Sequence, residues 1–355
     1  MKKIIASIPL LLLLLTSCDK KDENATFQND LKTYNLNGKV KSIQEKSYEI
    51  VGGDAKGNLK RENSATFDTE LEFDLNKQLI SEKSFLSDGK LIKTRTFENK
   101  SKLLSEDEFL PNDVVYKTKY TFDKGNNTII SKRDKEGRQI YKTVNTFEKG
   151  LLTQKRLFDK SDQLMERFTY KYDKKGNLIE ATLQNDYEVL YKDVYEYDTK
   201  NNKVSEARLD RSNTPAYKIA TQFKDSLITE IKSYDSKGNL ISLEKRNYDS
   251  KGNIESKSLE DLENKEYSKE AFKYDSAGNL VQWMQSVQDQ KPQIINYQYD
   301  DQKNLVHLQR IDNEGNVQEN RKYAYEYDEQ GNWIKKSIIN NDTQTFVIER
   351  KIQYY

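Results

Sequence analysis

The sequence predicts an all-β protein, a long array of antiparallel β-hairpins with no significant helix beyond residues 1–17. A Tyr-Asp-x-x-Gly-Asn stretch recurs through the second half at multiples of about 12–13 residues, which suits short strands joined by turns. Between these stretches aromatic and polar residues alternate, as they do in strands with two unlike faces. No window beyond residues 1–17 carries apolar residues at helical spacing between capping residues.

The repeated stretch has the chemistry of a strand-turn-strand unit, as residues 234–241 illustrate. Asp235 can accept a hydrogen bond from the backbone two residues on, and Gly238 can adopt the positive φ that closes a short hairpin loop. Five intact copies supply the predicted turn residues: Tyr172, Asp173, Gly176, Asn177, Tyr234, Asp235, Gly238, Asn239, Tyr248, Asp249, Gly252, Asn253, Tyr274, Asp275, Gly278, Asn279, Tyr327, Asp328, Gly331 and Asn332.

Altered copies extend the array in both directions. Asn201 and Lys303 stand at the glycine position of two later copies, and asparagine is the better suited of the two to a left-handed backbone. In the first half, phenylalanine replaces the repeated tyrosine, for example at Phe73 and Phe97. Because both rings favour strands, the change to tyrosine near residue 170 predicts wetter ring ends in the second half.

The number of strands limits the shape of the sheet. About 320 residues at one strand per 12–13 residues give about 25 strands. Twisted open sheets seldom exceed about ten strands without curling or splitting. We therefore expect a coiled, superhelical sheet, or two stacked halves that bury the aromatic face between them.

The Tyr-Asp-x-x-Gly-Asn-Leu stretches resemble the YD repeats of the Rhs family, most strongly over residues 165–340. The resemblance implies hairpins laid side by side in a long sheet that spirals, which encloses a toxin in the large members. We expect no toxin domain after the repeats, and at this length we expect the chain to be too short for a closed shell. The toxin-enclosing role is therefore not carried over.

The first residues predict that the chain is secreted and anchored to a membrane. A basic pair and a twelve-residue apolar run, too short to span a bilayer, form a secretory signal over residues 1–17. Residues 15–18, Leu-Thr-Ser-Cys, resemble the lipobox of bacterial lipoproteins, in which the cysteine carries the lipid. Cys18 is the only cysteine and has no disulfide partner. The alternative is an ordinary signal peptide with an incidental cysteine.

These features divide the chain into a lipoprotein signal peptide (1–17), a flexible polar tether (18–33) and a β-hairpin repeat domain (34–355). The lipid on Cys18, a palmitate-bearing anchor, predicts attachment to the cell envelope at the outer membrane. An acidic stretch at residues 19–23 resembles a surface-export signal, while a plain tether explains it equally well, so both membrane faces stay open. Near-equal numbers of basic (59) and acidic (58) residues argue against nucleic-acid binding.

Catalytic groups are scarce in the sequence. His307 is the only histidine, and its place in an alternating strand makes it a surface residue rather than a catalytic base. Lipidation removes Cys18 from catalysis, and a zinc site lacks ligands. The aspartates follow neither an EF-hand nor a β-roll pattern. We therefore expect no catalytic residues, no metal and no cofactor.

These inferences lead to a lipid-anchored, non-enzymatic envelope protein that binds a protein or a glycan. The tyrosine rows serve either as a binding platform or only as sheet packing, and Trp283 and Trp333 are the aromatic residues we most expect to be exposed. Two alternatives remain. Abundant carboxylates allow a polysaccharide hydrolase, and short hairpin-repeat proteins also accompany secreted toxins as protective partners.

Overall fold

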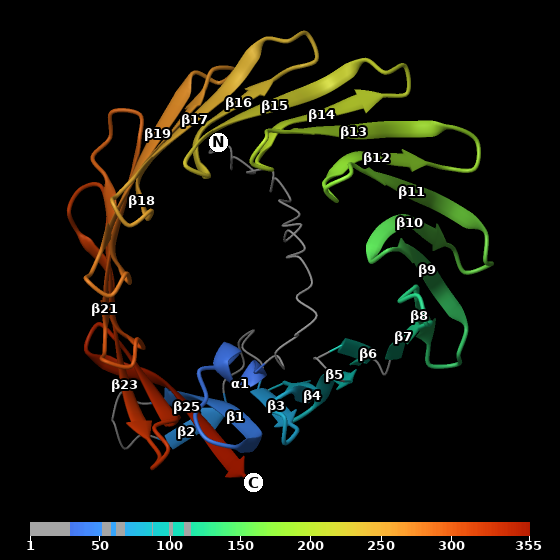
Figure 1. Cartoon of the computed structure of the whole chain (residues 1–355). Helices are drawn as coiled ribbons and strands as arrows, with labels where there is room; N and C mark the ends of the chain where they lie inside the picture. Colours follow the sequence, from blue (N-terminus) through green and yellow to red (C-terminus); the bar gives the residue numbers. More distant parts are fainter. Residues whose placement is uncertain (1–28, 52–57, 62–67, 87, 99–101, 110–114) are drawn as a thin grey trace, which may run out of the picture.

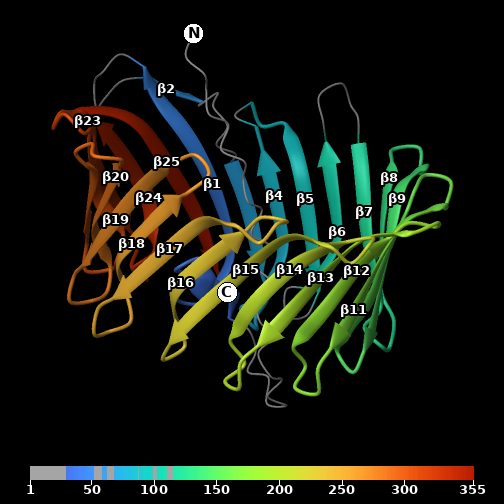
Figure 2. The ribbon, with the colours of Figure 1, turned by 90° about the horizontal axis from the view of Figure 1, so that it is seen from above.

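The computed structural model describes residues 29–51, 58–61, 68–86, 88–98, 102–109 and 115–355. This part of the chain contains one short helix and 25 strands, and 24 of the strands form a single closed ring (Figure 1). In the view turned by 90°, the strands run obliquely and next to one another around the ring (Figure 2).

The helix α1 is Asp30–Thr33. The strands are β1 (Val40–Val51), β2 (Asn58–Arg61), β3 (Asp68–Phe73), β4 (Leu79–Phe85), β5 (Leu91–Glu98), β6 (Lys102–Phe109), β7 (Val115–Phe122), β8 (Thr128–Asp134), β9 (Gln139–Glu148), β10 (Leu151–Phe158), β11 (Leu164–Tyr172), β12 (Leu178–Gln184), β13 (Val189–Tyr197), β14 (Lys203–Asp210), β15 (Pro215–Lys224), β16 (Leu227–Tyr234), β17 (Leu240–Tyr248), β18 (Ile254–Asp261), β19 (Glu266–Tyr274), β20 (Leu280–Val287), β21 (Gln293–Tyr299), β22 (Leu305–Ile311), β23 (Val317–Tyr327), β24 (Trp333–Asn340) and β25 (Thr343–Tyr354).

Each strand from β3 onward pairs antiparallel with the next one along the chain, and β25 pairs with β1. The short β2 pairs only with the far end of β1, so the other 24 strands make the ring. The all-β, antiparallel prediction is confirmed. The expectation of an open superhelix or two stacked halves, too short for a closed shell, is wrong, because the accumulated curvature of the sheet brings its two edges together and closure leaves no exposed edge.

The seam between β25 and β1 is a discontinuous copy of the repeat. Tyr354 pairs with Val40, as Tyr172 pairs with Leu178 inside an intact hairpin. The Tyr355 amide donates to the Lys39 carbonyl at 3.0 Å, as the aspartate amide does to the asparagine carbonyl in the intact turns, and Gly38 has the glycine's φ of +79°. The two ends of the described chain thus build one hairpin end without a covalent link.

The helix α1 lies inside the ring, against β1 and β3 (Figure 1). Its Leu31 and the following Leu36 join Val40, Ile43, Leu71, Phe73 and Leu79 in a buried hydrophobic core cluster. The Asp30 carboxylate accepts a hydrogen bond from the Leu79 amide at 2.7 Å. The predicted tether boundary at residue 33 is therefore wrong, since residues 30–33 are folded against the seam.

The other N-terminal predictions concern residues 1–28. The signal peptide, Cys18 and the tether up to residue 28 lie outside the described residues. Within the described ranges, α1 is only four residues long, and no helix there is long and apolar enough to cross a membrane.

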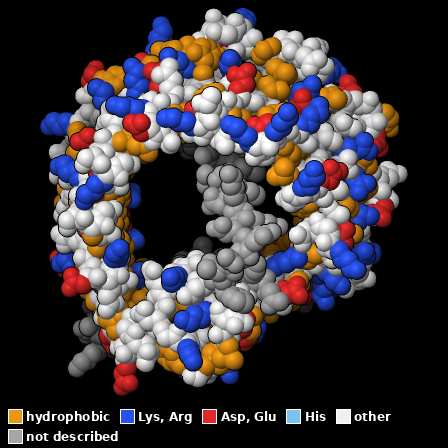
Figure 3. Space-filling model, in the orientation of Figure 1, with side chains coloured by type: hydrophobic (Ala, Val, Ile, Leu, Met, Phe, Trp, Pro, Cys, Tyr) orange, Lys and Arg blue, Asp and Glu red, His pale blue; other side chains and the backbone are white. Residues whose placement is uncertain are grey.

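Strand register fixes which side chains face the centre. Ile43 and Leu71 face α1, so they point inward, and directly opposed residues on paired strands point to the same side. Followed round the ring, this alternation places Phe168, Tyr195, Phe272, Tyr297 and Tyr325 on what we call the inner wall. The aromatic rows therefore face the centre of the ring, whose opening Figure 3 shows, rather than the space between two sheets.

Candidate functional site on the inner wall

The structure places all five predicted quartets in turns. In each, one aspartate oxygen accepts the backbone amide of the asparagine, at 2.8–2.9 Å. In four of them the asparagine amide group donates to the other aspartate oxygen. The glycines have φ between +77° and +88°. Asn201 and Lys303 hold the same position with φ of 68° and 65°, so the lysine bears the left-handed backbone predicted for it.

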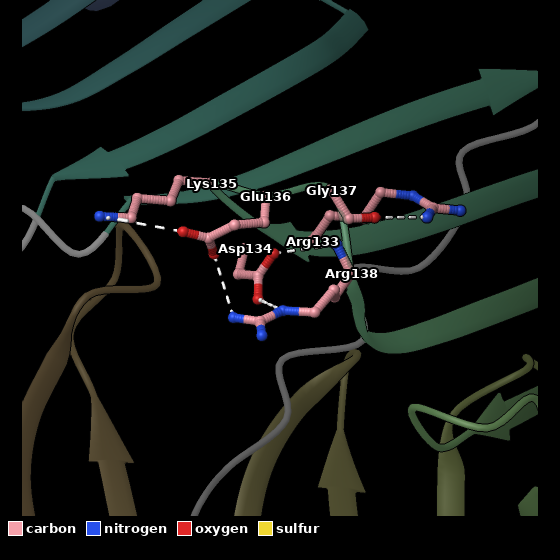
Figure 4. Close-up of polar contacts among 6 residues, drawn as sticks. All are labelled: Arg133, Asp134, Lys135, Glu136, Gly137 and Arg138. Atoms are coloured by element: carbon pink, nitrogen blue, oxygen red, sulfur yellow. Dashed lines mark hydrogen bonds and ion pairs between the residues drawn. The ribbon is translucent and has the colours of Figure 1, made fainter.

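The β8–β9 turn shows how the first half builds the same device with other residues (Figure 4). Asp134 accepts the Arg138 amide at 2.9 Å, and the Arg138 guanidinium returns to the same carboxylate at 2.6 Å and reaches Glu136 at 3.0 Å. Arg133 donates to the Gly137 carbonyl at 2.8 Å. Arginine here replaces the asparagine that closes the Tyr-type turns.

Replacing Gly238 with valine is expected to lower the free energy of unfolding by about 1–2 kcal/mol. A Cβ atom at this glycine meets nothing within 4 Å, so the loss comes only from forcing a β-branched residue to a φ of +82°. Ser236→Ala, in the same turn, should change stability far less. Equal thermal shifts for the two variants would contradict the turn geometry.

Acid is expected to destabilise the ring. Hydrogen bonds to the carboxylate hold the pKa of Asp173, Asp235 and Asp249 below the ordinary value of 3.8. The largest contribution comes from the asparagine side chain and the next from backbone amides. The same cause acts on Asp123, Asp198 and Asp275. Since the folded pKa is the lower one, the stabilisation is present above pH 3.8 and is lost as the pH falls through the folded values.

Chemical denaturation followed from pH 6 downward would measure this loss. Asp235→Asn should flatten the pH dependence because it removes one of the contributing carboxylates. A stability that stays constant below pH 3.8 would contradict the prediction.

Five tyrosines of the array bind the backbone of the strand before them. The Tyr172 hydroxyl donates to the Leu152 carbonyl at 2.8 Å, and Tyr197 does so to Leu178 at 2.9 Å. Tyr248, Tyr274 and Tyr325 make the equivalent bond to a carbonyl 20 residues earlier. The prediction of wetter ring ends is therefore wrong, because in these five tyrosines the hydroxyl fastens neighbouring hairpins together.

One cluster of aromatic and charged residues on the inner wall lies on β13–β15. Arg208 pairs with Asp193 through two hydrogen bonds of 2.8 and 3.0 Å, and its guanidinium carbon lies 3.9 Å from the centre of the Tyr191 ring. The bond to Asp193 raises the pKa of Arg208, and burial raises that of Tyr217 to about 12. This cluster is internally neutralised.

A second cluster, which we call the seam cluster, comprises Tyr325, Trp333, Lys336, Arg350 and Glu45. Arg350 is 15% exposed, pairs with Glu45 at 2.8 Å and stacks 3.3 Å from the Trp333 ring centre. Lys336 lies between Tyr323 and Tyr325, with its Nζ 4.8 and 5.6 Å from their ring centres. Among the described residues Lys336 has no carboxylate partner, and burial lowers its pKa. The seam cluster therefore presents an uncompensated cation between aromatic rings.

The tryptophans are not the exposed aromatic residues we expected. Trp283 and Trp333 are half-buried on the inner wall, and the Trp283 indole donates to Glu270 at 3.0 Å. The most exposed aromatic side chain in the described ranges is Tyr187, in the β12–β13 turn, at 94%. The register places both tryptophans on the same face as the tyrosines, and this face turns inward.

His307 forms no catalytic set in the described part of the chain. It sits on β22 on the side opposite the inward-facing Leu308, and its Nε2 lies 2.6 Å from the Asn320 Oδ1. No group of three or more His, Cys, Asp or Glu side chains suited to a metal occurs among the described residues. The aspartates that sequence composition left open for acid catalysis are largely turn caps.

Comparison with known families decides the identity of this fold. The family model described as Teneurin YD-shell matches residues 139–349, more than half of the chain. The chain belongs to the teneurin YD-shell family. The expected kinship with YD-repeat, Rhs-like proteins is thereby confirmed, and the closed ring is a YD shell. No curated protein matches the sequence.

Similarity to solved structures is distant. A crystal structure of TcdB2-TccC3 without its hypervariable C-terminal region is 11% identical with a TM-score of 0.29, and the match covers 85% of this YD shell. The chain spans about a quarter (24%) of that protein. A porin-like protein from Bacteroides uniformis is 10% identical with a TM-score of 0.21, and the match covers 90% of this chain and 99% of that one.

Proposed function

We propose that this YD shell is a non-enzymatic protein of the cell envelope that binds an acidic chain molecule, a glycan or a polypeptide, on its inner wall. The observation that carries the proposal is Lys336, a half-buried cation without a carboxylate partner among the described residues, set between Tyr323 and Tyr325. A carboxylate would pair with Lys336, while a pyranose face or an apolar side chain would lie against the rings.

The neighbouring charges favour an anionic ligand. Along β22–β25 and β1 the inner wall carries four cations, Arg310, Arg321, Lys336 and Arg350, against three acids, Glu319, Glu45 and Glu49. Glu319 already pairs with both Arg310 and Arg321, and Glu45 pairs with Arg350. An acidic group at Lys336 would therefore enter a region with a surplus of positive charge.

Intrinsic fluorescence offers a direct test, because Trp283 and Trp333, the only tryptophans, both face the inner wall. The full chain would be titrated with uronate-containing oligosaccharides, their neutral counterparts and acidic peptides. We expect saturable quenching by one acidic class, weakened about tenfold by Lys336→Gln through the loss of one charge-assisted bond.

Lys335→Gln is the matched control, since Lys335 is the adjacent residue, faces the opposite side and pairs with Glu326 at 3.0 Å. Equal weakening by both variants, or no binding by either acidic class, would refute the proposed site. Release of products from an oligosaccharide would instead favour the polysaccharide hydrolase.

The envelope location rests on Cys18 and is tested separately. In cells fed labelled palmitate, the wild-type chain should incorporate label and Cys18→Ala should not. Equal labelling of the two would refute the lipid anchor. The inner-wall binding site would still stand, because it does not depend on the anchor.

A further inference from the structure

Two arginines on the outside of the ring differ from the other described arginine side chains. Those others each reach a carboxylate or, in the case of Arg133, a backbone carbonyl. Arg156 on β10 and Arg167 on β11 make no ion pair and no hydrogen bond within the described residues. The Nε atom of each is buried without a partner, so each loses hydration and gains nothing in return.

The two side chains stand side by side. Arg156 pairs directly with Arg167 in the β10–β11 register, which brings their Cβ atoms to about 4.5–5.5 Å of each other. Both point outward, because Leu157 and its partner Glu166 occupy the inner wall at the next position. Like charges directly opposed on a sheet are destabilising, so the pair weakens the ring as it stands.

No neighbouring residue supplies the missing charge. In the same outward row, Val144 precedes Arg156 and Gln184 follows Arg167. Asp162, in the β10–β11 turn, is not available to the arginines because it already pairs with Lys142 at 2.6 Å. Both Lys142 and Arg156 lie over the Phe158 ring, at 4.7 and 5.8 Å from its centre. The site is thus a pair of guanidinium groups beside the Phe158 ring, and the acid at Asp162 is already paired.

We propose that Arg156 and Arg167 together bind a phosphoryl group. Two guanidinium groups from adjacent strands match the several oxygens of a tetrahedral dianion, and each can donate through its two terminal nitrogens. A dianion also offsets both positive charges, where a single carboxylate would offset one. The phosphoryl group belongs either to a membrane lipid or to a soluble phosphate ester, and the two sources share this chemistry.

Inorganic phosphate is the first probe. At matched ionic strength, replacing chloride with phosphate should raise the melting temperature of the full chain, and calorimetric titration should show saturable binding. Arg156→Gln and Arg167→Gln should each weaken that binding at least tenfold. Arg211→Gln, which removes the same charge from an exposed arginine paired with Glu188 at 3.0 Å, should leave it unchanged.

Stability without phosphate separates binding from a structural role. Because the opposed arginines repel each other, Arg156→Gln should raise the melting temperature in chloride or leave it unchanged. A large loss of stability in chloride would overturn the proposal, since it would make Arg156 a structural residue. Phosphate binding that survives in the double variant would overturn it as well.

Vesicles then identify the source of the phosphoryl group. The full chain bearing Cys18→Ala would be floated with phosphatidylcholine vesicles with and without phosphatidate. Phosphatidate-dependent flotation that Arg167→Gln abolishes supports a lipid headgroup, and phosphate binding without flotation supports a soluble ester. Failure at Arg156 and Arg167 leaves the inner-wall proposal intact, because that proposal rests on the opposite face of the sheet.

Discussion

Replacing Phe73 with alanine is expected to lower the free energy of unfolding by about 3–5 kcal/mol. Phe73 is 1% exposed and packs edge-on against Tyr34 at 5.7 Å between ring centres. It is the largest member of the hydrophobic core cluster, which is where α1 holds the first strands. The rest of the sheet has a thin core, so little else compensates for a cavity at this place.

The loss should be concentrated at the seam. Hydrogen exchange should accelerate more in β1 and β25 than in β13 and β14, because the core cluster packs against β1, β3 and β25. Leu75→Ala is the control, since Leu75 lies two residues away and is 70% exposed. A uniform acceleration round the ring, or equal losses for Phe73→Ala and Leu75→Ala, would contradict a localised core.

The turns could be predicted from sequence because their information is local. Asp235, Gly238 and Asn239 complete their hydrogen bonds within five residues, so the pattern that predicts the turn also builds it. Alternation likewise identified the aromatic face, and the spacing of turns gave a strand count of about 25, which the described chain has.

Closure could not be predicted in this way. It depends on Val40 meeting Tyr354, and on Asn37 and Asn332 exchanging hydrogen bonds of 2.8 and 3.0 Å across nearly the whole chain. No periodic pattern in the sequence predicts that the chain segments around Val40 and Tyr354 pair with each other. Length alone suggested an open sheet, because it says nothing of how much each hairpin bends the sheet.

The prediction that the tryptophans are exposed was wrong for a similar reason. That the tryptophans share the tyrosine face follows from the strand register, and that this face encloses the centre follows only from closure. Lys336 and the Arg156–Arg167 pair carry no sequence motif. These residues matter because the strand register places no carboxylate opposite them. Register across strands is not visible in the sequence.

A disulfide across the seam is expected to stabilise the ring more than one inside a hairpin. Ser42 and Gln353 oppose each other on β1 and β25, and Ser233 opposes Ser242 on β16 and β17. Both cysteine pairs would be introduced into Cys18→Ala, which leaves no other thiol. The seam bond closes a loop of roughly 310 residues and the hairpin bond one of roughly 10, so loop entropy favours the seam by about 3 kcal/mol.

The comparison isolates closure because both bonds join opposed residues of neighbouring strands. Urea denaturation of the oxidised and reduced forms would give the gain in free energy of unfolding for each pair. Because β25 and β1 pair without a covalent link, the seam disulfide restricts the conformational freedom of nearly the whole unfolded chain, which nothing else restricts. A seam gain no larger than the hairpin gain, or failure of the seam pair to oxidise in the folded chain, would mean that the ring spends much of its time open at Tyr354.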